Sequence, residues 1–285
     1  MRDCRLAMAA LVLVTLAGCT SPPLAGTHAF VDVGGGTRLH VETFGSGGTT
    51  VVFLHPGLHH FDNSFVKQRD VFAASRRVVG IDQRGHGHCP DDDRPYAYGE
   101  MADDTAAVIL RLGTGPVDLV GHSDGGNVAL LLAAAHPELV RRVVVSGANL
   151  RAGLPPEELA RRATWSAQQV ADAVSRLERR LPPAFRSDYE AVAPDGAQRW
   201  PTHVAKSYKM WLTPVVIDAA ALKSVRAPVL VMAGDKDFSS VEDTAEIYRG
   251  LERAQLFIVP GSGHATFDDR PDLVNAAVLE FLSRP

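Results

Sequence analysis

The chain has 285 residues, of which 46% are hydrophobic and 22% charged, and its 29 Lys and Arg against 33 Asp and Glu give a net charge of −4. These proportions are close to the average for globular proteins, so they exclude a disordered chain, a multi-span membrane protein and a fibrous repeat. The mildly acidic balance also argues against a nucleic-acid partner, which would require a clustered basic face.

Residues 1–18 are predicted to be a secretory signal. Two arginines precede an apolar stretch over residues 6–17, which is shorter than the roughly twenty residues that span a bilayer. The sequence Leu-Ala-Gly-Cys that ends at Cys19 resembles the lipobox of bacterial lipoproteins. The resemblance implies export across the inner membrane, cleavage before Cys19, acylation there, and an extracytoplasmic protein lipid-anchored to the cell membrane or envelope. An ordinary cleaved signal and a buried N-terminal helix are the alternatives, and residues 19–27 would form a tether.

The body of the chain alternates strand-like and helical segments. A hairpin is predicted around three consecutive glycines, with strands over residues 30–33 and 38–43. Apolar runs predict further strands over residues 50–54, 77–81, 117–120, 142–145, 228–233 and 255–259. Helical periodicity follows at residues 101–112, 126–135, 241–251 and 272–282. Apolar strands separated by helices predict an α/β fold whose sheet is mostly parallel and covered on both faces, with the opening hairpin making it mixed.

The alternation stops between residues 150 and 214, where the chain becomes polar and helical and carries its three tryptophans, Trp165, Trp200 and Trp211. This segment is predicted to be a helical cap inserted into a core formed by residues 28–149 and 215–285. An acidic run, Asp91 to Asp93, is expected to be a solvated loop.

Ser123 is the candidate nucleophile. It lies in Gly-His-Ser-Asp-Gly, which fits the G-x-S-x-G pattern between a predicted strand and a predicted helix. Such a sharp turn forces the serine into a strained backbone conformation and lifts its hydroxyl to the end of the sheet, while the flanking glycines avoid a clash. The following helix N-terminus favours developing negative charge.

A serine hydroxyl requires a base, and the base in turn requires an orienting carboxylate. His264 follows the last predicted strand and is the only histidine beyond His203. Asp235 and Asp237 follow the preceding strand, and either could serve as the acid. The order Ser, Asp, His is the one found in α/β-hydrolases.

On these motifs the chain resembles the α/β-hydrolase-fold proteins over about residues 28–283. The G-x-x-D pattern of that family falls on Gly234 and Asp237, which favours Asp237 as the acid and leaves Asp235 second. The oxyanion loop of the family usually has His-Gly, and here it is His-Pro-Gly-Leu over residues 55–58. The resemblance implies that the backbone N–H groups of Leu58 and Asp124 hold an oxyanion.

Several histidines lie near these motifs. His55, His122 and the side chain of Asp124 are candidates for contacts with substrate. His86 and His88 belong to the loop Asp-Gln-Arg-Gly-His-Gly-His, whose family counterpart is structural. Because no matched cluster of carboxylates or cysteines accompanies this histidine pair in the sequence, neither a metal nor a cofactor is expected.

The nucleophile type selects the expected reaction. Epoxide hydrolases and haloalkane dehalogenases of the resembled family use aspartate, so Ser123 disfavours those reactions. Serine favours acyl transfer to water from a small-molecule ester, thioester, lactone or amide, and the absence of a long apolar lid argues against a triglyceride lipase. The alternatives are a receptor-like or scaffold protein of the same fold and a cofactor-free haloperoxidase-like enzyme.

Two hypotheses apply to the side chain of Asp124. It could cap the following helix, since aspartate is a good N-cap and its charge suits the helix dipole. It could instead face the pocket and select substrates that carry a cationic or hydroxyl group.

Cys19→Ser tests the lipoprotein prediction. When the full chain is expressed in a bacterium fed labelled palmitate, we expect the protein to be labelled and to partition into detergent, because acyl chains at Cys19 supply membrane affinity. The variant should lose both properties. An unlabelled, soluble mature form that begins at another residue would contradict the prediction.

Overall fold

The computed structural model describes residues 26–151 and 154–284, so the predicted leader and Cys19 lie outside the described residues. One sheet of eight strands forms the centre, in the order β1-β2-β4-β3-β5-β6-β7-β8. The strands are β1 Thr27–Gly34, β2 Thr37–Phe44, β3 Val51–Leu54, β4 Val78–Ile81, β5 Val117–His122, β6 Val140–Ser146, β7 Val229–Gly234 and β8 Ala254–Val259. Every predicted strand is present, and the mostly parallel sheet confirms the predicted fold class.

The first two strands make the sheet mixed, as the glycine-flanked hairpin predicted. Strand β1 pairs antiparallel with β2, and β2 pairs antiparallel with β4. All pairings from β4 to β8 are parallel. The hairpin turn requires glycine because Gly34, Gly35 and Gly36 all have positive φ angles, of 98°, 60° and 82°.

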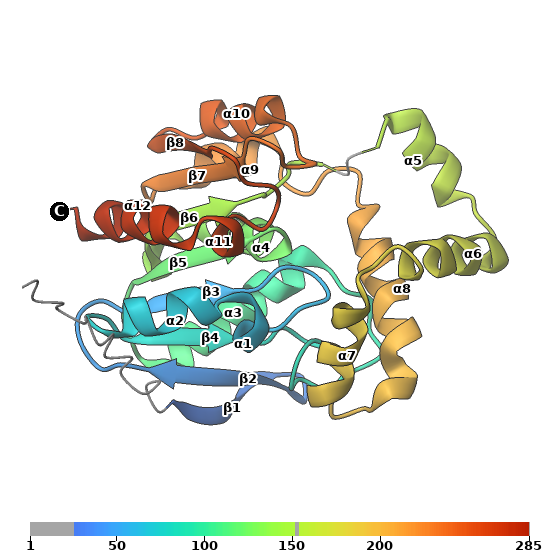
Figure 1. The fold of residues 1–285 in the computed structure, drawn as a ribbon, viewed down its shortest axis with the longest axis horizontal. Coiled ribbons are helices and arrows are strands. Elements are labelled where there is room, and N and C mark those ends of the chain that lie inside the picture. Colours follow the sequence, from blue (N-terminus) through green and yellow to red (C-terminus); the bar gives the residue numbers. More distant parts are fainter. Residues whose placement is uncertain (1–25, 152–153, 285) are drawn as a thin grey trace, which may run out of the picture.

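Two layers of helices cover the sheet (Figure 1). One face packs against α3 Tyr98–Leu112, α4 Asp124–Ala135, α9 Ala219–Ser224 and α10 Val241–Gly250. The other face packs against α1 Phe61–Ser64, α2 Val66–Ala73, α11 Thr266–Asp269 and α12 Pro271–Ser283. Side chains of alternate strand residues pack into the cores on opposite faces of the sheet. For example, Val52 and Leu54 pack into one core, and Val51 and Phe53 pack into the other. No helix in the described ranges is long and apolar enough to cross a membrane.

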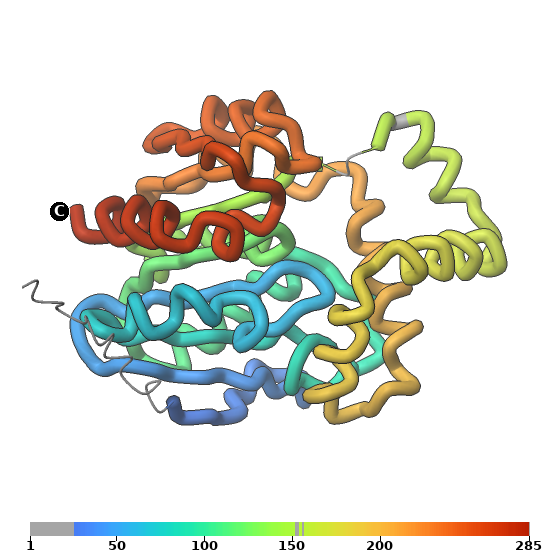
Figure 2. The backbone as a smooth tube through the Cα atoms, in the orientation of Figure 1, coloured from blue at the N-terminus to red at the C-terminus, as the bar shows by residue number. Residues whose placement is uncertain are grey.

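Four helices between β6 and α9 stand apart from the sheet, as Figures 1 and 2 show: α5 Pro156–Ala163, α6 Ala167–Glu178, α7 Pro183–Val192 and α8 Trp200–Trp211. We call these four helices the cap. Trp200 is fully buried in a small core that also contains Val174, Tyr189 and Val204. Leu58, from the loop after β3, joins this core and so connects the cap to the sheet layer.

The acidic run after β4 is a loop in which Asp92 and Asp93 are exposed, as expected, but Asp91 departs from that expectation. The Asp91 carboxylate is buried, with its side chain 4% exposed, and it pairs with Arg199 at 2.7 Å and with Lys206 of α8. Asp93 also pairs with Arg199. A carboxylate buried this deeply requires cationic partners, and the cap supplies them. The run therefore docks the cap onto the core.

Candidate active site

Ser123 lies on the turn between β5 and α4 with φ 54° and ψ −118°, a left-handed conformation for a residue with a side chain. Its backbone N–H donates to the Ser146 carbonyl at 2.7 Å. The flanking glycines are necessary: a Cβ at Gly121 would collide with the backbone of Gly125, and one at Gly125 would collide with the Leu54 carbonyl. The turn therefore brings the start of α4 against β3 and β5 and presents Ser123 at the carboxyl edge of the sheet.

His264 and Asp237 meet at the same edge, on the loops that follow β8 and β7. The Nδ1 atom of His264 is 2.8 Å from Oδ1 of Asp237. The Asp237 side chain is fully buried, and its Oδ1 also accepts from the Ser239 N–H at 3.0 Å. Gly147 leaves room for the imidazole, since a Cβ there would lie 2.6 Å from its Cε1. The carboxylate thereby orients the imidazole ring.

Asp235 lies in a different environment. Its Oδ1 accepts from the backbone N–H groups of Gly261 at 2.8 Å and Ser262 at 3.2 Å. These residues belong to the loop that carries His264. Asp235 thus holds the loop, while Asp237, the aspartate that the family pattern favours, contacts the ring.

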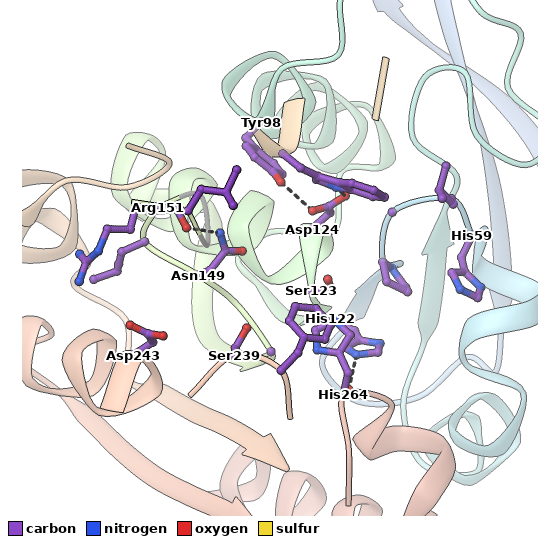
Figure 3. A pocket seen from close by; sticks show the side chains of 18 of the residues that line it. His59, Tyr98, His122, Ser123, Asp124, Asn149, Arg151, Ser239, Asp243 and His264 are labelled. Atoms are coloured by element: carbon purple, nitrogen blue, oxygen red, sulfur yellow. Dashed lines mark hydrogen bonds between the residues drawn. The ribbon is translucent and has the colours of Figure 1, made fainter. Parts of the chain in front are cut away.

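A cavity of about 1330 Å³ opens over this edge, between the core and the cap. Ser123, His122 and His264 line its floor, and Figure 3 shows Ser123 between the side chain of Asp124 and the two histidines. The walls are largely apolar and come in good part from the cap and its connections: Leu154, Leu159, Leu181, Phe185, Trp211 and Val215. Asp243 and the ion-paired Arg151 and Glu246 also line the cavity. The candidate nucleophile therefore faces a large and mainly apolar chamber.

The arrangement of strand, serine turn, late histidine and inserted cap agrees with a family comparison. The model of the alpha/beta hydrolase family matches residues 51–277, which is most of the chain. The chain belongs to this family.

Individual relatives in the family are distant hydrolases. The chain is 28% identical to an sn-1-specific diacylglycerol lipase of Mus musculus over 253 residues, covering 82% of this chain and 80% of the relative. It is 26% identical to a 2-hydroxymuconate semialdehyde hydrolase of a Pseudomonas species over 274 residues, covering 88% and 92%. Est816, an N-acyl homoserine lactone degrading enzyme, has a similar structure, with a TM-score of 0.70 and 26% identity over 89% of this chain and all of that one. These similarities identify the chain as a hydrolase.

The two histidines predicted to contact substrate, His55 and His122, lie in different surroundings. His122 lines the cavity, and its Nε2 is 2.8 Å from the His264 carbonyl oxygen. His55 is 2% exposed and is absent from the cavity wall; its Nδ1 is 2.8 Å from the Pro56 carbonyl, and its Nε2 accepts from the Gln83 N–H at 3.0 Å. Burial lowers the pKa of each imidazole to about 3, so both rings are neutral. Because the backbone occupies both nitrogens of His55, its ring has no free polar atom for the predicted contact with substrate.

The oxyanion loop has its own strained residue. Leu58 has a φ of 63°, is 3% exposed and lines the cavity. Gly57, next to it, leaves space for the side chain of Asp124, because a Cβ at Gly57 would collide with that carboxylate. The predicted contribution of the Leu58 and Asp124 N–H groups to an oxyanion hole stays a prediction.

The Asp124 side chain lines the cavity, as one hypothesis expects, but the structure shows a further role for it. It makes no capping hydrogen bond, and Ser123 occupies the N-cap position of α4. Its Oδ1 accepts from the Tyr98 hydroxyl at 2.7 Å and its Oδ2 from Nε1 of Trp211 at 2.8 Å. Burial raises the pKa of Asp124, and the two donated hydrogen bonds act against that rise. Since both oxygens already have partners, the carboxylate serves as a connection between core helix α3, cap helix α8 and the serine turn.

Tyr98 and Trp211 are the site residues that sequence reasoning missed. Tyr98 begins α3 and Trp211 ends α8, more than one hundred residues away in the chain. The three tryptophans of the insertion were a signal of buried contacts, but nothing in their spacing indicates which one meets the core. A third missed residue, Phe238, is 80% exposed and lies with its ring centroid 4.1 Å from that of His264.

Asp124→Asn tests this connection. An amide that keeps one acceptor for Tyr98 must present NH₂ toward Nε1 of Trp211, so two donors would face each other in a buried site. We expect a loss of unfolding free energy of about 1–3 kcal/mol and a lower kcat/KM, with an unchanged ratio between cationic and neutral esters. Thermal unfolding and an ester panel measure the two effects.

Trp211→Phe and the double variant complete a cycle with Asp124→Asn. Both substitutions break the same hydrogen bond between Trp211 and Asp124, so their losses of unfolding free energy should be strongly non-additive. Asp103→Asn, on the exposed side of α3, is the control and should change neither property. A selective loss on cationic esters in Asp124→Asn would instead support recognition by the carboxylate.

Proposed function

We propose that this hydrolase cleaves a small-molecule carboxylic ester or a related acyl bond through a Ser123–His264–Asp237 triad and an acyl-enzyme. The observation that carries the proposal is the convergence of the strained serine turn and the 2.8 Å pair between His264 and Asp237 on one cavity. A serine in the nucleophile position favours acyl transfer over the reactions that use a carboxylate nucleophile.

In this mechanism Asp237 determines which nitrogen of His264 acts as the base. If Nδ1 of His264 donates its proton to Oδ1 of Asp237, Nε2 is left with a free lone pair. Nε2 then takes the proton of Ser123 Oγ as the oxygen attacks the carbonyl carbon. The buried carboxylate stabilises the imidazolium that forms. In free hydrolases the contact between base and nucleophile is often long and tightens when substrate binds.

The negative charge on the carbonyl oxygen needs hydrogen-bond donors. The backbone N–H groups of Asp124 and Leu58 are proposed to supply them, together with the positive end of α4. Collapse of the tetrahedral intermediate breaks the bond to the leaving alcohol, which takes the proton from His264. Water then attacks the acyl group on Ser123, His264 accepts its proton, and the carboxylic acid leaves with Oγ reprotonated.

The cavity supports an uncharged and largely apolar substrate. Its leucine, phenylalanine and tryptophan walls favour an acyl or alkyl chain by burial of apolar surface, which contributes roughly 0.8 kcal/mol per CH₂. Its volume of about 1330 Å³ exceeds what an acetyl group fills. A diacylglycerol lipase and an acyl homoserine lactone degrading enzyme are among the similar proteins, which supports an acyl substrate. We further propose that the protein acts outside the cytoplasm, attached to a membrane by acyl groups at Cys19.

Ser123→Ala, His264→Ala and Asp237→Asn are each expected to lower kcat by at least about 10³-fold on a chromogenic ester, because the three groups act as one unit. A double variant should lose little more than a single one. Wild type should also be labelled by a fluorophosphonate probe, and Ser123→Ala should not.

Two matched variants are the controls. Asp235→Asn should cost less than about tenfold in kcat, since it weakens hydrogen bonds to a loop without touching the imidazole. Ser239→Ala changes another serine that lines the cavity and should keep the probe labelling. If Asp235→Asn lost activity while Asp237→Asn kept it, Asp235 would be the acid. If the probe still labelled Ser123→Ala, Ser123 would not be the nucleophile.

A further inference from the structure

A second cluster of titratable groups lies away from the cavity, where the hairpin β1–β2 meets the loop after β4. Nδ1 of His40 is 3.1 Å and Nδ1 of His88 is 2.9 Å from the same Oδ2 atom of Asp82. Possible ligand atoms of these three residues all lie within 4.8 Å of one another. None of these residues lines the cavity.

Glu42 joins the cluster from β2 and is the observation that requires an explanation. It is 1% exposed, and neither of its carboxylate oxygens has a hydrogen-bond partner among the described residues. Its Oε1 is 3.9 Å from Nδ1 of His40, and its Oε2 is 3.8 Å from Nδ1 of His28. Asp82 and Asp62 add further negative charge nearby. Burying such a carboxylate without a partner is costly, whereas a cation beside it removes the cost.

Other groups hold the ligand atoms in place. The Phe61 N–H donates to Oδ1 of Asp82 at 2.9 Å, and the His88 N–H donates to Oδ2 at 3.0 Å. The Cys89 thiol donates to the Asp82 carbonyl at 3.0 Å and accepts from the His40 N–H at 3.0 Å. Nε2 of His40 is 3.4 Å from Nδ1 of His28. Hydrogen bonds of this kind orient carboxylate and imidazole ligands in metal sites.

We propose that this cluster binds one divalent first-row transition-metal ion, with Zn²⁺ as the best fit, through His40 Nδ1, His88 Nδ1, Asp82 Oδ2 and a carboxylate oxygen of Glu42. Two imidazoles with two carboxylates match the preference of Zn²⁺, whereas Mg²⁺ and Ca²⁺ prefer oxygen ligands alone. Tetrahedral ligands at bond lengths of about 2.0–2.2 Å stand about 3.3–3.6 Å apart, so the ligand atoms of His40, His88 and Asp82 need only small shifts. Glu42, whose Oε1 is 3.9 Å from Nδ1 of His40, lies outside that group of three and must turn toward the ion. The imidazoles bind as neutral rings with the proton on Nε2, and the ion takes the place of the Nδ1 protons.

The ion would add a link between segments that strand pairing and buried hydrogen bonds already bring together. Strand β1 is the edge of the sheet, and His40 and Glu42 lie on its partner β2. Asp82 and His88 lie on the loop after β4, and Asp82 also holds the start of α1 through the Phe61 N–H. The His88 side chain is 33% exposed, which gives an ion access from solvent. The site is therefore structural and independent of Ser123.

This site departs from the expectation that no metal would be bound. In the sequence only His86 and His88, separated by one residue, suggest a pair of metal ligands. In the fold they separate: Nδ1 of His86 is 2.9 Å from the Arg84 carbonyl, and its ring packs against His203, so it lies outside the cluster. The carboxylates that the pair lacked come from Asp82, earlier in the same loop, and from Glu42 on a distant strand.

Metal binding to the full chain tests the proposal, with Cys4→Ser and Cys19→Ser as background so that leader thiols do not bind zinc. The protein is stripped with EDTA, equilibrated with Zn²⁺ or with Mg²⁺, dialysed and assayed for metal content and thermal unfolding. We expect one Zn²⁺ per chain, a Tm several degrees higher with Zn²⁺, and no effect of Mg²⁺. Co²⁺ in place of Zn²⁺ should give the intense visible bands of a four-coordinate site.

Three variants separate this site from adventitious binding. His88→Ala and Glu42→Gln should each weaken Zn²⁺ binding at least about tenfold and abolish the Tm gain. In EDTA, Glu42→Gln should be at least as stable as wild type, because it removes an unpartnered buried charge. A lower stability in EDTA would therefore show a folding defect rather than lost metal binding. His136→Ala is the control because His136 lies 3.3 Å from Asp103 and 3.8 Å from Glu138 on the exposed surface. It should keep full binding.

Retention of no zinc by the stripped and reloaded wild type would overturn the proposal. Equal zinc binding by wild type, His88→Ala and Glu42→Gln would overturn it as well. Ser123→Ala should bind zinc as wild type does, so the outcome does not depend on the proposed function.

Discussion

Ser123 is held at a φ of 54° by close backbone packing on both sides of it, a conformation that costs on the order of 1–3 kcal/mol for a residue with a side chain. Close packing against the parallel strands β3, β5 and β6 fixes this position. Gly121 and Gly125 allow α4 to begin directly against β3, and the Ser123 N–H bonds to the end of β6. Everything else in the candidate site is arranged around this fixed point, because the loops after β7 and β8 end at the same edge of the sheet.

The cap is fixed to the core by buried polar contacts as well as by apolar ones. The Asp91 carboxylate forms ion pairs with Arg199 and Lys206, and the Asp124 carboxylate accepts a hydrogen bond from the indole N–H of Trp211. Buried charges contribute little net stability after desolvation, but a wrong arrangement that leaves one unpaired is strongly disfavoured. These contacts therefore define the position of the cap, and hence the shape of the cavity wall, more than they strengthen the fold.

Asp124 connects the serine turn with the cap. It is adjacent to the nucleophile in the chain, and its carboxylate connects α3 with the last residue of α8. A displacement of the cap that broke the Trp211 bond would leave a buried carboxylate oxygen unsatisfied beside the proposed oxyanion site. The position of the cap and the electrostatics at Ser123 are coupled through this one side chain.

The sequence by itself determined the α/β class, the strand order in the chain, the serine turn and the late histidine, because apolar runs, helical periodicity and glycines around a sharp turn are local signals. It also predicted α3 and α4 to within a few residues, yet it missed α2, whose residues show little amphipathic periodicity.

The G-x-x-D pattern favoured Asp237 over Asp235, but only the tertiary structure decided that Asp237 contacts the His264 ring while Asp235 accepts hydrogen bonds from the backbone of the His264 loop. It likewise decided that Asp124 contacts Trp211 and that Glu42 lies beside His40 and Asp82. Each of these contacts joins segments brought together by strand pairing or by the docking of the cap, and no local pattern encodes such a distance.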